Sequence, residues 1–376
     1  MFCVIFFGVS YQQSNYSFKS PQYTASIINA ASPPETKTPG SLSVEQKIAQ
    51  LFMVGIDSQN TKEAEQFVQQ NLTGGIILLT KNFQNENQTR DLINKLQSAS
   101  REGVGVPLFI SVDQEGGGVS RVPFSDVEST SQTETISPAQ AYAIAKQRGE
   151  ELKNLGITMN FAPVLDVITN PKSFLYNRVF PGNVQKISEL GLLSAQGYRD
   201  AGILSCAKHF PGHGDALTDP HNTTSINNQT TQEIKNNIQS FSQVIGTGIP
   251  CIMVGHVIDS VISPLPASQS PEIINLLRDQ EHFNGIIITD DMEMAAARFD
   301  SMVGSGRARP NQTIAQASLS ALQAGADMVL ISGYTTTQQQ REQIIREVTQ
   351  KIIAGALTQK QLDEKISRIL RIKNSL

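Results

Sequence analysis

Residues 208–215, with the sequence KHFPGHGD, hold the densest group of chemically active side chains in this 376-residue chain. With Asp219 and His221 just beyond them, they bring three of the five histidines and two carboxylates into fourteen residues. The segment follows a short apolar run, residues 202–207, typical of a buried strand, so its polar residues are expected in a glycine-rich loop after that strand. Loops in this position often carry catalysis, because a rigid scaffold holds them.

Other polar residues follow other apolar runs of the chain. Asp113, Asp166 and Asp290 each stand at the end of such a run, and His256 does the same. Because the C-terminal ends of parallel strands in a barrel surround one cavity, these residues are expected to meet although they lie up to nearly 180 positions apart.

The elements that must position these residues alternate along the chain. Apolar runs predict eight buried strands, around residues 51–55 and at 75–79, 107–112, 159–162, 206–207, 251–254, 286–289 and 328–331. Helical spacing occurs at 89–101, 139–155, 187–201, 231–245, 271–280 and 314–324, with one or two C-terminal helices over 348–373. Ser43 is expected to cap a further helix beginning near residue 44.

This alternation favours an α/β fold of the (β/α)8 TIM-barrel type, with C-terminal helices packed on the barrel. A doubly wound open sheet is the alternative, because counting strands does not prove closure. No G-x-G-x-x-G fingerprint follows the first strand to support that alternative.

The string KHFPGHGD with the following D-x-H resembles the signature of glycoside hydrolase family 3, in its bacterial β-N-acetylglucosaminidase branch. Residues 112–117 (VDQEGG), 160–167 (NFAPVLDV) and 288–292 (ITDDM) resemble the other strand-end motifs of that family, in the expected order. The resemblance covers roughly residues 42–375. Two positions depart from it: the family usually has arginine at Gly118 and serine at Pro220, which puts the contacts of one loop and the motion of the other in doubt.

The resemblance implies that Asp290 is the nucleophile of a retaining mechanism, and that Asp219 and His221 form the acid/base dyad. An imidazole with a pKa near ~6.5 exchanges protons around neutral pH, and an adjacent carboxylate can set its tautomer. Asp291 is the competing nucleophile, but its side chain is expected to point away from the pocket if that of Asp290 points in.

The same resemblance assigns the grip on the non-reducing sugar to four residues: Asp113, Arg178, Lys208 and His209. Each has suitable donors or acceptors for hydroxyl groups. His213, between two glycines, is expected to position its loop. For Asp166 and His256, a role in the pocket and a structural role are both open.

The expected function is that of a retaining exo-β-N-acetylhexosaminidase, which removes terminal N-acetylglucosamine from peptidoglycan fragments or chitooligosaccharides through a covalent intermediate, without a cofactor. A β-glycoside phosphorylase or β-glucosidase of the same family is the alternative. A third hypothesis is a catalytically lapsed barrel that binds cell-wall glycans. No metal site is expected, because the spacings of His209, His213, Asp215 and His221 match no zinc pattern.

The composition is that of an ordinary globular chain, with 39% hydrophobic and 17% charged residues and a net charge of −4. Because there is no polybasic footprint, nucleic acid is not an expected partner. The expected partner is a carbohydrate, the expected state a monomer, and no run beyond the N-terminus is long and apolar enough for a stable membrane span.

Residues 1–40 are expected to be the remnant of an export signal or a disordered linker, preceding a catalytic domain over 41–376. Residues 1–9 are apolar but lack a basic start, and the polar stretch after them contains Pro33-Pro34. An exported or envelope-associated location is favoured, with a cytoplasmic one as the alternative. Cys206 and Cys251 lie in apolar runs and are expected to be small core residues rather than disulfide partners.

Overall fold

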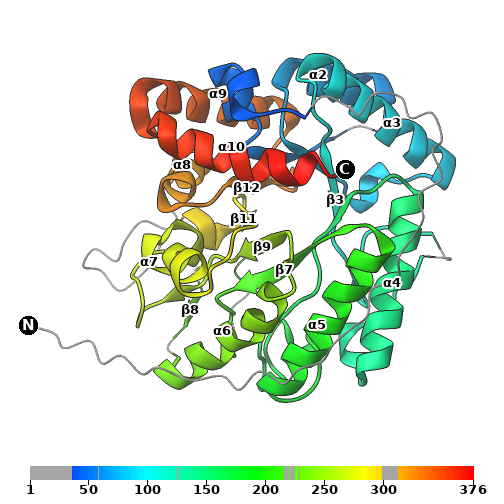
Figure 1. Ribbon diagram of the computed structural model, residues 1–376, viewed down its shortest axis with the longest axis vertical. Helices are drawn as coiled ribbons and strands as arrows, with labels where there is room; N and C mark the ends of the chain where they lie inside the picture. The colour runs from blue at the N-terminus through cyan, green and yellow to red at the C-terminus, as the bar shows by residue number, and fades with distance from the viewer. Residues whose placement is uncertain are drawn as a thin grey trace, which may run out of the picture. The chain divides into compact units, whose positions relative to one another are not determined.

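Eight parallel strands close into a barrel in the computed structural model of the chain (Figure 1). The structure describes residues 36–57, 59–124, 127–215, 220, 225–227, 229–298 and 312–376. Residues 1–35, which include the expected export segment and most of the expected linker, lie outside the described residues. Residues 37–376 form one compact unit.

Each of the eight predicted apolar runs contributes one barrel strand. These are β1 (Phe52–Gly55), β2 (Gly75–Ile77), β3 (Phe109–Val112), β6 (Met159–Asn160), β7 (Leu204–Phe210), β9 (Cys251–Val254), β11 (Ile286–Asp291) and β12 (Met328–Ile331). Their order is β1-β12-β11-β9-β7-β6-β3-β2, and β2 pairs with β1 to close the circle. The closure confirms the TIM-barrel prediction and excludes the open doubly wound sheet.

Helices surround the strands (Figure 1). They are α1 (Val44–Ala49), α2 (Thr61–Asn71), α3 (Glu86–Gly103), α4 (Pro138–Asn154), α5 (Val184–Ala201), α6 (Thr231–Ile245), α7 (Pro271–Asn275), α8 (Ile314–Ala324), α9 (Gln338–Lys351) and α10 (Gln359–Lys373). The side chain of Ser43 caps α1 as predicted, by accepting the N–H of Gln46. Among the described residues, no helix combines the length and the apolar character that crossing a membrane requires.

Some helix boundaries differ from the prediction. Helix α2 was not among the expected helices, although Asn60 caps its first turn. Residues 271–280 were expected as one helix, but α7 passes into a π-helical turn, η6 (Leu276–Gln280).

Strands β7 and β11 extend further than their apolar runs. The backbone N–H of Lys208 donates to the carbonyl of Pro163 at 3.0 Å, and Phe210 pairs with Val254 of β9. The prediction that Lys208 and His209 begin a loop is therefore wrong. The strand continues through polar residues because its backbone still has partners on both sides, which hydrophobicity alone does not reveal.

The prediction for the two core cysteines is also wrong. Cys206 of β7 and Cys251 of β9 are joined by a disulfide, 45 positions apart in sequence. They are direct partners in the register of these neighbouring strands, with Cα atoms 4.4 Å apart, which is within disulfide reach. Both cysteines are buried, so the disulfide is a core feature.

Candidate active site

A short hairpin after β3 forms one wall of the barrel mouth. It consists of β4 (Gln114–Gly116) and β5 (Val119–Ser120), which pair antiparallel. The side chain of Asn160 both accepts the N–H of Gln114 and donates to its carbonyl, each at 2.9 Å. Arg148 donates to the carbonyl of Glu115 at 2.9 Å. These contacts fix the backbone from which Glu115 projects.

The turn of this hairpin requires glycine at one position. Gly116 has a φ of 94°, and a Cβ there would lie 2.1 Å from the carbonyl oxygen of Thr130. Gly118 is different: a Cβ at this position would meet no atom within 4 Å. The absence of the family's arginine therefore leaves open space and does not reflect a steric demand for glycine.

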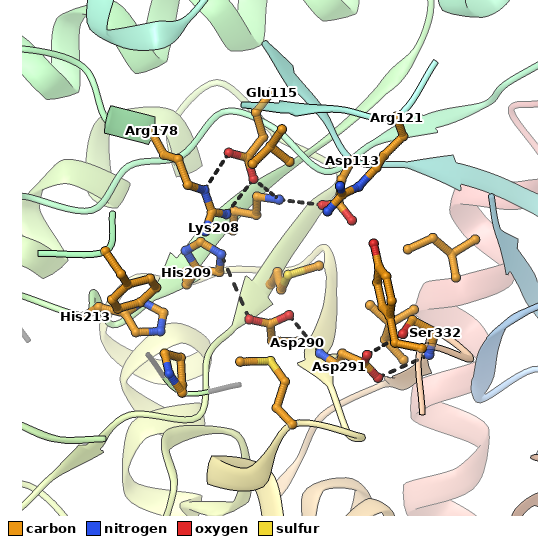
Figure 2. A pocket seen from close by; sticks show the side chains of 18 residues that line it. Asp113, Glu115, Arg121, Arg178, Lys208, His209, His213, Asp290, Asp291 and Ser332 are labelled. Carbon is orange, nitrogen blue, oxygen red and sulfur yellow. Dashed lines mark hydrogen bonds and ion pairs between the residues drawn. The ribbon is translucent and has the colours of Figure 1, made fainter. Parts of the chain in front are cut away.

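A buried ion network lies at the inner end of this wall (Figure 2). Lys208 Nζ is 2.6 Å from both Asp113 Oδ1 and Glu115 Oε1, and Arg178 binds Glu115 through two nitrogens at 2.9 and 2.7 Å. Burial would raise the pKa of Glu115, but Arg178 and Lys208 lower it to about 2. Burial would lower the pKa of Lys208, but Asp113 and Glu115 raise it. Glu115 and Lys208 are therefore ionised at neutral pH.

Asp166 hydrogen-bonds to two histidines of the 208–215 segment, His209 and His213. Its carboxylate accepts the backbone N–H and contacts the ring Nδ1 of both His209 and His213, over 2.7 to 3.0 Å. Burial lowers the pKa of His209, and Asp166 only partly opposes this. The neutral ring of His209 therefore places its Nδ1–H on Asp166 and leaves Nε2 as an acceptor.

Within the described part of the chain, Asp166, His209 and His213 are the group whose possible ligand atoms lie close enough together to hold a metal ion. The two oxygens of Asp166 already bond to two backbone N–H groups and two ring Nδ1 atoms, which suits a carboxylate that orients the rings of His209 and His213. Among the described residues, His213 Nε2 is buried without a hydrogen-bond partner.

Asp290 lies near the end of β11, where the register with β12 shifts between Ile288 and Asp291. Its Oδ1 accepts the N–H of Asp291 at 2.8 Å, and its Oδ2 lies 4.0 Å from His209 Nε2 (Figure 2). Burial would raise the pKa of Asp290, but the N–H of Asp291 and the nearby Lys208 ammonium hold it below its ordinary value. This carboxylate is therefore ionised at neutral pH.

His256 hydrogen-bonds to the backbone at this end of β11. Its Nε2 lies 3.0 Å from the carbonyl oxygen of Asp291, and its Nδ1 lies 2.8 Å from Ser268 Oγ. Because burial lowers its pKa to about 4, the ring is neutral, donating from Nε2 to the carbonyl and accepting from the serine hydroxyl.

Asp291, whose side chain was expected to point away from the pocket, is among the residues that line it together with Asp290. Strict alternation does not hold at this end of β11, because its register with β12 shifts between Ile288 and Asp291. The Asp291 carboxylate is nevertheless engaged elsewhere, since it accepts hydrogen bonds from the N–H and hydroxyl of Ser332 (Figure 2). Burial and the nearby Glu293 raise its pKa.

A pocket enclosing about 660 Å³, part of it open to solvent, brings five of the seven predicted site residues together. Its lining includes Asp113, Arg178, Lys208, His209 and Asp290. His213 also lines the pocket, whereas Asp166 and His256 act from behind its wall.

Asp219 and His221 lie outside the described residues. Pro220, between them, is described: it lines the pocket, and its carbonyl accepts the N–H of Ala296 in the short helix η7 (Ala295–Arg298) at 3.1 Å.

Sequence reasoning missed several pocket residues. Glu115 is one, although it stands inside the VDQEGG motif of residues 112–117. Its buried position between Arg178 and Lys208 could not be predicted, because only the fold brings these residues together. Arg121, Ser332 and Tyr334 are others. Ser332 and Tyr334 follow β12, a predicted strand, so the strand-end rule could have identified them.

Comparisons with known proteins agree with this geometry. Residues 43–372 match the model of the glycosyl hydrolase family 3 N-terminal domain. A β-hexosaminidase of Methylobacillus flagellatus is 32% identical over 73% of this chain and 78% of its own length. β-Hexosaminidase A of Pseudoalteromonas piscicida is 31% identical over 81% of this chain, which spans about half (53%) of that protein.

Among solved structures, a family 3 β-N-acetylglucosaminidase from Paenibacillus sp. superposes with a TM-score of 0.80 and 29% identity, over 89% of this chain and 62% of that one. The matched region contains every described residue of the pocket. The chain therefore belongs to glycosyl hydrolase family 3, in its bacterial β-N-acetylhexosaminidase branch.

Proposed function

We propose that this glycoside hydrolase is a retaining exo-β-N-acetylhexosaminidase that releases terminal β-linked N-acetylglucosamine from peptidoglycan fragments or chitooligosaccharides, without a cofactor. The observation that carries the proposal is one pocket in which an ionised Asp290 faces the Lys208 network. The names of the relatives, which are β-hexosaminidases, support the choice of sugar.

Asp290 is the proposed nucleophile. One of its carboxylate oxygens attacks the anomeric carbon and forms a glycosyl ester while the glycosidic bond breaks; water then attacks the same carbon and releases the carboxylate. The hydrogen bond from the N–H of Asp291 to Oδ1 orients this carboxylate, and that N–H and the Lys208 ammonium keep it ionised.

The sugar-binding role is proposed for Asp113, Arg178, Lys208 and His209. Asp113 and Arg178 are the more open members of the ion network, each with 20% of its side chain exposed. Their free oxygens and N–H groups suit a pair of neighbouring hydroxyls. His209 Nε2, freed by the bond from Nδ1 to Asp166, is an acceptor for one hydroxyl.

The acid/base role is proposed for His221, with Asp219 as its partner. In the first step the imidazolium gives its proton to the leaving oxygen, and in the second the imidazole accepts a proton from water. The position of Pro220 on the pocket wall, between these two residues, supports this assignment.

The substrate is tested with two chromogenic glycosides. The purified protein should release p-nitrophenol from the N-acetyl-β-glucosaminide far faster than from the β-glucoside. The reverse preference would favour a β-glucosidase. Product analysis with and without inorganic phosphate separates hydrolysis from phosphorolysis, since only a phosphorylase forms the sugar 1-phosphate.

Detectable turnover would distinguish an active hydrolase from a barrel that has lost catalysis and only binds glycans. Turnover that disappears in Asp290→Ala would exclude that hypothesis. Tight binding of chitooligosaccharides without turnover in the native protein would instead overturn the proposal of an active hydrolase.

The two catalytic roles fail in different ways when the residue is removed. His221→Ala should cripple substrates with poor leaving groups but spare the first step for activated aryl glycosides, whose phenolate departs with little protonation. Azide, a small anionic nucleophile, should partly restore the second step. If all leaving groups suffer equally and azide rescues none, His221 is not the acid/base.

A further inference from the structure

The loop of residues 332–336, between β12 and α9, is tied down by two buried carboxylates. Its donors are Ser332 N and Oγ, which bind Asp291, and Gly333 N, Thr335 N, Thr335 Oγ1 and Thr336 Oγ1, which bind Glu293. Hydrogen bonds to buried ionisable groups are strong and directional. They therefore hold this loop in one conformation at the pocket edge.

Tyr334 is the central residue of this loop. Its side chain lines the active-site pocket, yet the residue is 58% exposed. A fixed loop thus presents a large aromatic ring at the mouth of a pocket whose interior is charged. Isolated exposed aromatics are common on protein surfaces, so the surroundings of the ring must decide whether this one has a role.

Arg121 lies at the same rim, on the residue directly after β5. Its guanidinium carbon is 6.0 Å from the centroid of the Tyr334 ring, which allows a cation–π contact between the hairpin and the β12–α9 loop. The Nε atom of Arg121 is buried and has no hydrogen-bond partner within the described part of the chain. Arg121 also lines the pocket, so its guanidinium has N–H donors to offer to a ligand there.

The chemical class of the ligand follows from where Tyr334 and Arg121 lie relative to Asp290. If the terminal sugar occupies the charged interior with its anomeric carbon at Asp290, the leaving group extends toward the pocket mouth. A pyranose has a face of slightly positive C–H groups, which packs on the negative face of an aromatic ring, and a periphery of hydroxyls that accept from N–H donors.

We propose that Tyr334, supported by Arg121, forms a binding subsite for a pyranose in the leaving group. The inference rests on the proposed hexosaminidase function and adds the residues that bind the leaving-group sugar. Tyr334 stacks on the first sugar beyond the scissile bond, and the guanidinium of Arg121, which also lines the pocket, donates to one of its hydroxyls. The enzyme therefore prefers glycans to glycosides with small aglycones.

The test compares two substrates that share the terminal sugar. One is the β-1,4-linked disaccharide of N-acetylglucosamine, and the other is N-acetyl-β-glucosaminyl fluoride, whose leaving group is too small to stack. In Tyr334→Ala the ratio of kcat/KM for the disaccharide to that for the fluoride should fall roughly tenfold, the size expected for one lost stacking contact. Tyr334→Phe should keep the ratio, because the ring is retained.

Tyr142→Ala is the matched control, since this tyrosine lies on α4 and binds Asp200 at 2.9 Å outside the pocket. Its ratio should equal that of the native enzyme. An unchanged ratio in Tyr334→Ala, or an equal fall in Tyr334→Phe, would overturn the subsite. Failure of the native enzyme to hydrolyse the fluoride would overturn the proposed function instead, so the two failures are distinguishable.

Discussion

Buried ion networks occupy both ends of this barrel, and they differ in what completes them. At the C-terminal ends of the strands, Lys208 lies between Asp113 and Glu115. At the N-terminal ends, the arrangement is inverted: Asp327, which precedes β12, lies between Arg278 and Arg368. Each network neutralises a buried charge with two of the opposite sign.

The difference lies in exposure to the pocket. Asp327 is fully buried, and the N–H of Ile287 completes its hydrogen bonding at 2.8 Å. Its partners Arg278 and Arg368 are 17% and 25% exposed but do not line the active-site pocket. Asp113 and Arg178, each with a fifth of the side chain exposed, do line it. The two networks therefore have different roles. The Lys208 network leaves donors and acceptors in the pocket for a substrate, whereas the Asp327 network bonds within the chain.

The largest expected effect separates the two ends by activity. Asp290→Asn removes the nucleophilic oxygen, so kcat should fall by about 10⁴-fold or more while the chain stays folded. Steady-state kinetics and far-UV circular dichroism measure the two quantities. Asp327→Asn, assayed where it is folded, should keep a kcat close to the native value. A comparable loss of kcat in both variants would contradict the separation.

The second effect is on stability and is centred on the other end. Asp327→Asn leaves two partly buried guanidinium groups, those of Arg278 and Arg368, without their buried carboxylate, so the free energy of unfolding should fall by about 3 kcal/mol. Urea denaturation measures the loss. Glu364→Gln is the matched control, because this carboxylate is 51% exposed and pairs at 3.9 Å with Lys360, whose side chain is 86% exposed. Its cost should stay below about 1 kcal/mol; equal losses would show that burial is not the cause.

The smallest effect is a pH dependence that originates at the catalytic end. Burial lowers the pKa of His256 to about 4, whereas in the unfolded chain it is near ~6.5. The unfolded state therefore binds more protons between these values, so the stability contributed by neutral His256 is full above about pH 6.5 and is lost as the pH falls toward 4. The loss amounts to at most about 3 kcal/mol.

Unfolding measured from pH 7 to 4 tests this contribution. His256→Gln keeps a donor for the carbonyl of Asp291 but does not titrate, so its stability should fall less steeply over this range than that of the native chain. Parallel curves for the two proteins would mean that His256 does not titrate as the geometry implies.

The sequence alone determined the architecture and most of the proposed site. Eight apolar runs separated by helical segments specify eight parallel strands, because a strand buried on both faces must be apolar along its length. The parallel arrangement then places Asp113, Lys208 and Asp290 at one mouth. Local capping also follows from sequence, as at Ser43, because a cap involves residues only a few positions apart.

Only the tertiary structure decided where strands β7 and β11 end, which way Asp291 turns, and that Cys206 bonds to Cys251. It also placed Glu115 between two cations and Tyr334 at the pocket mouth. The physical reason is common to all of these. Each depends on a partner brought close by strand register or loop packing, and a one-residue shift in register changes that partner without changing the pattern of apolar runs.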